Sequence, residues 1–427
     1  MSILHPTRSL TALVPLYAQK FSCIGSSCKD SCCSGWTVTI DKKTFNSYRQ
    51  SKNPNLIDRL DSQVKRQRNQ ASDKNYARMV LEPTTGECLM MEERLCSIHK
   101  ELGEDKLSDT CFSYPRATYE AGDFYQQALM LSCPEAARLA LLADDALEFS
   151  ESVISVRKGT VETLKPKHGL SASQMNEVRF FCIQLIRTEG LLIWQKLALL
   201  GLFCESLTLA LKEGELGRVS QIIASTQEIV RSNQTSVLFE SMQSHYEIQA
   251  VAFFMLWRSK SIVKYSASQR LVHEAVALGL GFEKNSVHEA LTLGVGFNLE
   301  ADSVAQKRMV ESYERGVKNL PQALKDAPFF LENYILNELF KDCFPFDQAT
   351  PYEHYLRLIT RFGMVRFMMA AQCSSENNLP TVQSLVDTVQ AFCRRYQHDT
   401  QFSATVNACL NNSGWSDLQK IYRFLKT

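Results

Sequence analysis

Four cysteines lie within eleven residues near the start of the chain, in the stretch FSCIGSSCKDSCCSGW. Four more follow at wider intervals, beside residues typical of loops, in TGECLMMEERLCSIH, SDTCFSYPR and LSCPE. Such loops let a backbone fold around a metal and direct several sulfurs at it, so the pattern predicts a metal or iron–sulfur centre. We expect about four ligands from the set Cys23, Cys28, Cys32, Cys33, Cys88, Cys96, Cys111 and Cys133.

The spacing leaves the identity of the metal open. Thiolate sulfur suits both zinc and iron–sulfur clusters. A closed zinc site usually shows two short-spaced pairs, and only Cys28 with Cys32 or Cys33, and Cys88 with Cys96, come near that pattern. The C-x2-C-x2-C run of bacterial ferredoxins is absent. Zinc and iron–sulfur therefore remain equal alternatives at this point.

Composition and charge predict where these thiols work. Apolar residues make up 45% of the 427 residues, charged residues 22%, and the net charge is +1. This balance favours neither nucleic acid nor an acidic membrane as a partner. No secretory signal is visible at the start, and the longest apolar run, residues 191–204, is interrupted by Gln195 and Lys196. We expect a cytoplasmic protein, whose cysteines stay reduced and form no disulfides.

The elements that position the cysteines are expected to be helices and loops. The sequence predicts a mainly α fold, in which a cysteine-rich, loop-rich metal-binding part over residues 1–155 precedes a large all-helical domain over residues 172–427. Residues 134–154 look helical, with Pro134 near the helix start. Residues 157–173, with Gly159, Pro166 and Gly169, have the composition of a linker.

Helical periodicity continues beyond the linker. Ser171 and Gln174 form a capping-box pair ahead of apolar residues at helical spacing. Residues 191–211 are apolar nearly all round and should form a central buried helix. VHEAVALGLGF, at 272–282, recurs as VHEALTLGVGF, at 287–297. We interpret its glycines as helix-end turns, because neither copy follows a strand or carries the third glycine of a dinucleotide loop.

The order of the cysteine motifs resembles the flagellin lysine-N-methylase family. The motif C-x4-C-x3-C-C is followed by ECLMMEERLCSIHKELGEDKLSDTCFSYPR and LSCPE. The later stretches at 331–346 and 361–369 are also similar to that family. The front part resembles small cysteine-rich proteins described as zinc- or iron-chelating as well. The resemblance extends over the whole chain.

The resemblance implies an activity and its cofactors. The implied enzyme is a protein-lysine N-methyltransferase that moves methyl groups from S-adenosylmethionine to ε-amines of flagellin. An iron–sulfur cluster, 4Fe–4S, is implied in the cysteine-rich part, with zinc as the runner-up. The glycine-rich first turn of the common α/β methyltransferases is not found in this sequence. An iron atom with an open coordination position offers one route for holding the methionine end of the cofactor.

Candidate catalytic residues lie close to the cysteine loops. The ε-amine of lysine has a reference pKa of about 10.4 and must lose its proton before it attacks a methyl group. Tyr114 could orient or accept from the amine, and Arg116 could hold a cofactor carboxylate in two hydrogen bonds. Tyr119 and His99 are further candidates. Packing around the metal is the alternative role for all of them.

Two other functional classes stay open. One is a metal or iron–sulfur carrier with a helical partner-binding domain. The other is a different cluster-dependent enzyme, such as one that uses radical chemistry on the same cofactor. A carrier would lose its metal to an acceptor without any cofactor-dependent turnover, whereas a methylase would modify flagellin only when S-adenosylmethionine is supplied.

Overall fold

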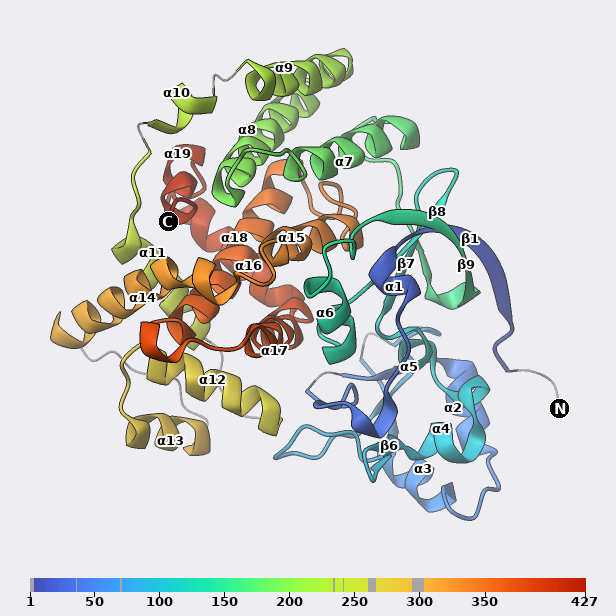
Figure 1. The fold of residues 1–427 in the computed structure, drawn as a ribbon. Helices are drawn as coiled ribbons and strands as arrows, with labels where there is room; N and C mark the ends of the chain where they lie inside the picture. Colours follow the sequence, from blue (N-terminus) through green and yellow to red (C-terminus); the bar gives the residue numbers. More distant parts are fainter. Residues whose placement is uncertain are drawn as a thin grey trace.

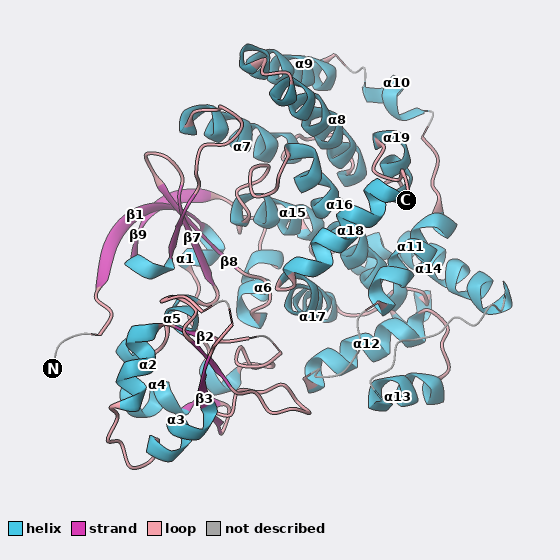
Figure 2. Cartoon of the chain, turned by 180° about the vertical axis from the view of Figure 1, so that it is seen from behind, coloured by secondary structure: helices cyan, strands magenta, loops and turns pink. Residues whose placement is uncertain are grey.

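The computed structural model describes residues 4–35, 37–69, 71–232, 235–240, 242–259, 266–293 and 303–427. Every regular element that it describes beyond residue 172 is a helix, which confirms the predicted mainly α fold. Figure 1 shows the helices gathered together, a curved sheet beside them and the cysteine-rich segment below the sheet. Figure 2 shows the same arrangement from behind.

A five-stranded sheet carries the N-terminus, and its strand order is β10-β7-β8-β1-β9. Strands β1 and β9 pair antiparallel over their whole lengths, from Thr7 opposite Arg157 to Pro15 opposite Phe149. The five strands are β1 Thr7–Pro15, β7 Arg116–Glu120, β8 Tyr125–Leu129, β9 Phe149–Arg157 and β10 Val161–Thr163. Two helices pack beside the sheet, α1 Leu16–Gln19 and α6 Pro134–Leu141.

The cysteine-rich segment has a small hydrophobic cluster of its own, built around Ile40, Tyr48, Leu60 and Met90. Its short strands are β2 Thr39–Ile40, β3 Val64–Arg66, β4 Ala77–Met79, β5 Met91–Glu92 and β6 Leu95–Cys96. Its helices are α2 Lys42–Arg49, α3 Ile57–Gln63, α4 Ser97–Leu102 and α5 Asp109–Ser113. Between these elements run the loops that carry several of the cysteines.

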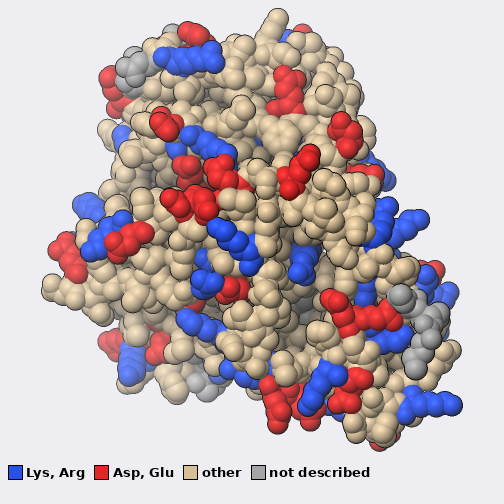
Figure 3. All heavy atoms as spheres, turned by 45° about the vertical axis from the view of Figure 1, so that its right-hand side comes forward, with Lys and Arg blue, Asp and Glu red and all other residues tan. Residues whose placement is uncertain are grey.

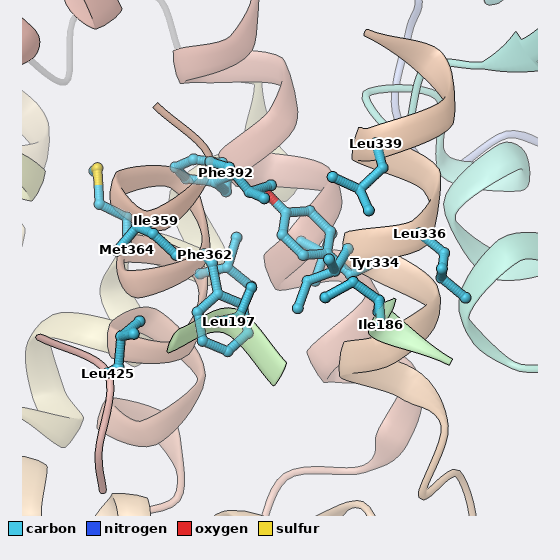
Figure 4. Close-up of a cluster of buried hydrophobic side chains, with 14 of the residues drawn as sticks. Ile186, Leu197, Tyr334, Leu336, Leu339, Ile359, Phe362, Met364, Phe392 and Leu425 are labelled. Atoms are coloured by element: carbon cyan, nitrogen blue, oxygen red, sulfur yellow. The ribbon is translucent and has the colours of Figure 1, made fainter. Parts of the chain in front are cut away.

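The helical part contains the main hydrophobic core. Its helices are α7 Ala172–Ile186, α8 Ile193–Lys212, α9 Val219–Arg231, α10 Thr235–Glu240, α11 Tyr246–Arg258, α12 Ala267–Gly279, α13 Lys284–Leu293, α14 Ser303–Ala323, α15 Phe330–Lys341, α16 Pro351–Gln372, α17 Val382–Phe392, α18 Thr400–Asn412 and α19 Leu418–Ile421. A π-helix, Cys393–Gln397, continues α17. Figure 4 shows Tyr334 of α15 and Phe362 of α16 among the buried side chains of this core.

The predicted central buried helix is present as α8. It is the one described helix long and apolar enough to cross a membrane, but 67% of its apolar window is buried inside the protein. Leu197, Leu200 and Phe203 are fully buried in the main core. Its length and composition are therefore explained by packing against other helices. The capping box of Ser171 and Gln174 at the start of α7 is also confirmed.

The sheet corrects one expectation from the sequence. Residues 134–154 were expected to be helical throughout, but the helix ends at Leu141 and Phe149–Arg157 forms β9. Ile154 and Val156 are buried while Val153 is 72% exposed, which is the alternation of a strand. The partner strand comes from the far N-terminus, so local periodicity did not reveal the pairing.

The stretch expected to be a linker also takes part in the sheet, because β10 pairs in parallel with β7. The large hydrophobic core includes residues from Tyr17 to Leu425. The division of the chain near residues 156–171 stays a prediction.

The first copy of the repeat ends α12 as predicted, with Gly281 at a φ of 89° in the turn that follows. The glycines of the second copy lie outside the described residues. Figure 3 shows acidic and basic side chains interspersed over one face of the molecule, without a broad area of one sign. This mixture agrees with the net charge of +1.

Candidate functional site

The eight predicted metal-ligand cysteines come from loops and helix starts on both sides of one region. Cys33, Cys88, Cys96 and Cys111 pack in or against the small hydrophobic cluster, whereas Cys133 belongs to the main core. A hydrogen bond of 2.6 Å from the Cys88 amide to the Cys33 carbonyl joins two of the loops. The region therefore lies where the two hydrophobic clusters meet.

Cys32 is the electrostatic centre of this set. Burial is the main cause that raises the pKa of five of its neighbours, and the negative charge of a Cys32 thiolate raises each of them further. Such an effect needs sulfurs that lie near one another in a poorly screened environment. The five are Cys28, Cys88, Cys96, Cys111 and Cys133. Cys23 acts on Cys28 in the same way.

Cys32 itself is the sulfur best prepared to ionise. Its Sγ lies 3.7 Å from the Sγ of Cys33. The hydrogen bond from Cys33, aided by the positive charge of Arg394, lowers the pKa of Cys32 to about 7, although burial acts in the opposite direction. The same hydrogen bond and burial raise the pKa of Cys33. Because the thiolate is the form that binds metals, Cys32 is the strongest single candidate ligand.

Two further cysteines occupy helix starts, Cys96 before α4 and Cys133 before α6. Burial raises the pKa of the Cys133 thiol to about 12, and hydrogen bonds from the amides of Ala136 and Glu135 oppose that rise. Backbone N–H groups directed at sulfur are donors that stabilise a thiolate once a metal is bound. The donor set and its surroundings thus fit a thiolate-bound metal centre.

The sulfurs are not arranged as a compact shell around one small ion. A tetrahedral zinc site with bonds of about 2.3 Å needs sulfurs roughly 4 Å apart. Among the described residues, no three cysteine sulfurs lie within 4.8 Å of one another. The identity of the metal therefore stays a prediction.

One closer set of metal-type ligands was missed by the sequence analysis. His5, Asp41 and Asp109 offer atoms that all lie within 4.8 Å of one another. Nε2 of His5 is 2.8 Å from Oγ1 of Thr44, and Arg157 lies 3.5 Å from Asp109. Thr44 also donates to Asp41, so each member of the set has a protein partner, and we assign no ion to it. Its position ties the N-terminus to the cysteine-rich segment.

A buried ion pair joins the helical part to the loop that carries Cys28, Cys32 and Cys33. Nη1 of Arg394 lies 3.2 Å from Oδ2 of Asp30, and both side chains are almost fully buried. Arg394 also donates to the carbonyl and hydroxyl of Ser34. Gln390 donates to Asp30 and to the carbonyl of Ser132, at 3.2 and 2.9 Å. The loop that holds Cys28, Cys32 and Cys33 is therefore fixed against α17 and the π-helix.

A short hydrogen-bonded chain leads from the cysteines into the helical part. The hydroxyl of Ser132, next to Cys133, lies 2.9 Å from the hydroxyl of Tyr114 and 2.9 Å from Nε2 of His398. Burial, followed by the charges of Lys341 and of two arginines, lowers the pKa of His398 to about 4. His398 is therefore a neutral base at physiological pH.

His398 also borders a cavity with a volume of about 390 Å³. This size is within the range of small-molecule sites. The cavity lies between β7, the end of α15, the loop that follows it, α16, the end of the π-helix and α18. Its lining residues are Ala117, Tyr119, Met130, Lys341, Asp342, Asp347, Gln348, Arg357, Arg361, Gln397, His398, Ser403 and Ala404.

Ion pairs cover one side of this cavity. Arg361 lies 2.8 Å and Arg357 3.2 Å from Oδ2 of Asp342, and Arg357 lies 2.8 Å from Asp347. Burial acts to raise the pKa of Asp342, but the charges of Lys341, Arg357 and Arg361 hold it well below its usual range. Asp342 is consequently an anion throughout the physiological range.

The structure separates the residues that were predicted to be catalytic. Tyr119 lines the cavity, and Tyr114 lies behind His398, with the two ring centroids 6.4 Å apart. Arg116 is exposed at the start of β7 and lies over the ring of Phe21. His99 is exposed on α4, where its amide donates to Cys96. The catalytic roles of Tyr114 and Arg116 stay predictions.

The cavity residues of α15 and α16 were not among the candidates expected from the sequence. A signal was present, because Arg357 and Arg361 stand four residues apart within a helix that is otherwise mostly apolar and buried. Charges at such spacing share one face of a helix. His398 offered no comparable signal, since its partner Ser132 is far away in the sequence.

A family model matches the helical part of the chain, and one relative matches most of its length. A family model described as the FliB lysine N-methylase C-terminal domain matches residues 179–424, which include the helical walls of the cavity. A lysine-N-methylase of Salmonella choleraesuis strain SC-B67 is 25% identical over 403 residues, covering 92% of this chain and 94% of that protein. That match therefore includes most of the cysteine-rich part.

Two further relatives match shorter stretches. A lysine-N-methylase of Salmonella typhimurium strain LT2 is 30% identical over 244 residues, which is 56% of this chain and 57% of that protein. The flagellar biosynthetic protein FliU of Salmonella muenchen is 34% identical over 145 residues, covering 34% of this chain and 85% of that protein. No solved structure matches the chain.

Proposed function

The chain belongs to the FliB lysine N-methylase family, and on that premise we propose that it is a protein-lysine N-methyltransferase acting on flagellin. The observation that carries the proposal is the position of the cavity, whose helical walls lie within the matched segment and whose His398 is linked through Ser132 to the cysteine region. The lysine-N-methylase and flagellar names of the relatives support the reaction and the substrate.

The methyl donor in this proposal is S-adenosylmethionine. It carries a carboxylate, an ammonium and a sulfonium group, so a site for it needs side chains of both charges. The cavity wall has both, in Arg357 and Arg361 beside Asp342 and Asp347. The described elements include no parallel strand followed by a glycine-rich turn and a helix.

Some of the eight cysteines would hold a 4Fe–4S cluster, with Cys32 as the first candidate. When bound, such a cluster supplies a Lewis-acidic iron and one-electron chemistry. Arg394 and the amides directed at Cys96 and Cys133 would stabilise its negative charge. A cytoplasmic location keeps these thiols reduced. Zinc is the competing metal, and iron, sulfide and zinc analysis of anaerobically purified protein decides between them.

The chain's own groups prepare the lysine for reaction. Burial in the cavity disfavours a charged ammonium, so it lowers the pKa of an entering lysine and increases the fraction of neutral amine. His398, held by its hydrogen bond with Ser132, lies on the same wall, where it can contact the entering amine.

The direct test is the intact mass of flagellin after incubation with the full-length protein, purified without air. With S-adenosylmethionine present, we expect the mass to rise in steps of one methylene group, at lysines located by peptide mapping. Without the donor, the mass should stay constant. Unmodified flagellin in both samples, with protein whose metal centre is loaded, would contradict the proposal.

A carrier of metal or clusters is the second candidate. The observation in its favour is that Cys23 and Cys32 are exposed, so an acceptor could reach them. A carrier should pass its metal to an acceptor protein at the same rate with or without S-adenosylmethionine. A carrier function would not explain the ion-paired cavity beside the cysteine region.

A further inference from the structure

We propose that the amino-acid end of the methyl donor binds to the ion-paired wall of the cavity, at Arg357, Arg361 and Asp342, and that the cysteine centre is not needed for donor binding. This rests on the proposed function, because it takes S-adenosylmethionine as the donor. It departs from the expectation that an iron atom of a cluster ligates the methionine group.

The wall and the side chains directly behind it are balanced in charge. Lys341, Arg357 and Arg361 are the cations, and they pair with the anions Glu338, Asp342 and Asp347. A zwitterion adds one charge of each sign and keeps this balance. A ligand with only a carboxylate, or only an ammonium, would leave an unmatched charge in a poorly solvated site.

The two arginines have hydrogen-bonding capacity left for a carboxylate. Arg361 contacts Glu338 and Asp342 through Nη1, and Arg357 contacts its partners through Nη2. Among the described residues, the Nε atoms of both guanidinium groups have no hydrogen-bond partner. A guanidinium has five N–H donors, and two on one edge match a carboxylate. If the guanidinium group of Arg357 or Arg361 rotates, it can bind a ligand carboxylate, and no further charged side chain is needed.

Burying these charged side chains costs desolvation free energy, so the ion pairs are a poor means of stabilising the fold alone. The side chains of Arg357 and Arg361 are each only 9% exposed, and that of Lys341 is 8% exposed. Replacing buried ion pairs with apolar groups of similar size is often neutral or stabilising. Ions on the wall of a cavity are more readily explained by recognition of a charged ligand. The same wall carries Asp342, which can accept from the ligand's ammonium group.

The sulfonium gives the carboxylates a second role. During transfer, the lone pair of the lysine nitrogen forms the new N–C bond, and the pair of the breaking C–S bond stays on sulfur. The donor loses its positive charge as the lysine nitrogen gains one, and that nitrogen then releases its proton. Asp342 and Asp347 attract the cationic donor more than the neutral thioether product. We therefore expect the cavity to bind S-adenosylmethionine more tightly than S-adenosylhomocysteine.

The cavity can be blocked without disturbing its buried ions. Ala404 lines the cavity from α18 and is exposed, so a large side chain there should fill the space while the fold is kept. Thr405, its exposed neighbour, is not part of the lining and gives a matched control. The variants are Ala404→Trp and Thr405→Trp in the full chain. Arg361→Gln tests the ion-paired wall, with circular dichroism to confirm its fold.

Titration calorimetry with S-adenosylmethionine is the measurement. We expect Ala404→Trp and Arg361→Gln to weaken binding by about tenfold or more, which is about 1.4 kcal/mol. Thr405→Trp should bind as the unaltered protein does. Cys32→Ser, which is designed to disturb the metal centre, should change the dissociation constant less than threefold.

Three results would overturn the inference. The first is an unchanged affinity for S-adenosylmethionine in Ala404→Trp. The second is a loss of binding in Cys32→Ser while Arg361→Gln still binds normally. The third is that the unaltered protein does not bind S-adenosylmethionine at all. The proposed function is judged separately. If flagellin is methylated but donor binding does not depend on the cavity, only this inference is rejected. If donor binding depends on the cavity but flagellin is not methylated, only the proposed function is rejected.

Discussion

At the scale of single residues, Cys32 connects the cysteine frame. Its Sγ is hydrogen-bonded to that of Cys33. The charge of its thiolate raises the pKa of five other cysteines, which come from separate loops and helix starts. It is also the thiol whose pKa lies nearest neutrality, because the hydrogen bond from Cys33 and the charge of Arg394 favour its thiolate. Removing it should therefore affect the metal centre more than removing a cysteine elsewhere.

Cys32→Ser is expected to lower bound iron, or zinc if zinc is the metal, by more than half. Serine keeps the size of the side chain but is a far poorer ligand for these metals. The matched control is Cys409→Ser, because Cys409 is also exposed but lies on α18, outside the frame. Metal and sulfide analysis after anaerobic purification measures both. Full metal content in Cys32→Ser would remove Cys32 from the ligand set.

His273 makes the stability of the folded protein depend on pH. It is fully buried on α12, where Nε1–H of Trp257 donates to its Nδ1 at 2.9 Å. Burial, helped by the charge of Arg395, lowers its pKa from 6.5 to about 3. The unfolded chain therefore binds a proton near pH 6.5 that the folded chain refuses until about pH 3. This part of the stability is lost as pH falls through that window.

His273→Gln should reduce the loss of stability between pH 7 and pH 5 by roughly 2 kcal/mol. His288→Gln is the natural control, because His288 holds the same place in the second copy of the repeat but is exposed. Urea unfolding at several pH values gives the free energies. An identical pH dependence in His273→Gln and the unaltered protein would show that His273 is not the titrating group.

At the scale of elements, the sequence identified helices well and the sheet poorly. Ser171 and Gln174 marked the start of α7, and the apolar run at 191–211 became α8, because both signals are local. The pairing of β1 with β9 joins residues well over a hundred positions apart, and no local pattern encodes it. The gathering of the eight cysteines has the same origin. Their types and spacing were readable, whereas their relative positions depend on two separate cores.

Close helix crossings give a prediction at this scale. A Cβ on Gly316 of α14 would lie 1.7 Å from the carbonyl oxygen of Ala370 on α16, so the two helices would have to separate. Gly316→Ala should destabilise the protein by about 3 kcal/mol. Gly217→Ala is the control, because a Cβ there meets no atom within 4 Å. Thermal or chemical unfolding measures the difference, and equal stability of the two variants would contradict the packing.

At the scale of the whole molecule, the cysteine loop and the helices have to act as one unit. Asp30 and Arg394 form a buried pair across this joint, and Lys29 and Asp387 form a more exposed pair at 3.3 Å. Breaking a buried pair leaves an uncompensated charge, while exposed pairs contribute little. The two pairs differ in burial but join the same parts of the chain. Their comparison therefore isolates the buried contact.

Arg394→Gln should destabilise the folded protein by about 3 kcal/mol and lower its metal content. Lys29→Gln should change stability by less than about 1 kcal/mol and leave the metal content unchanged. Thermal unfolding together with metal analysis measures both effects. If Arg394→Gln kept its metal and its stability, the cysteine centre would not depend on the helical part.

The central claim is that this molecule moves a methyl group from S-adenosylmethionine to flagellin lysines at the cavity beside its cysteines. The most direct measurement supplies donor with a deuterated methyl group and maps the label on flagellin by mass spectrometry. We predict labelled ε-amines with the unaltered protein and Thr405→Trp, and almost none with Ala404→Trp. Unlabelled flagellin throughout, or equal labelling by Ala404→Trp, would contradict this account.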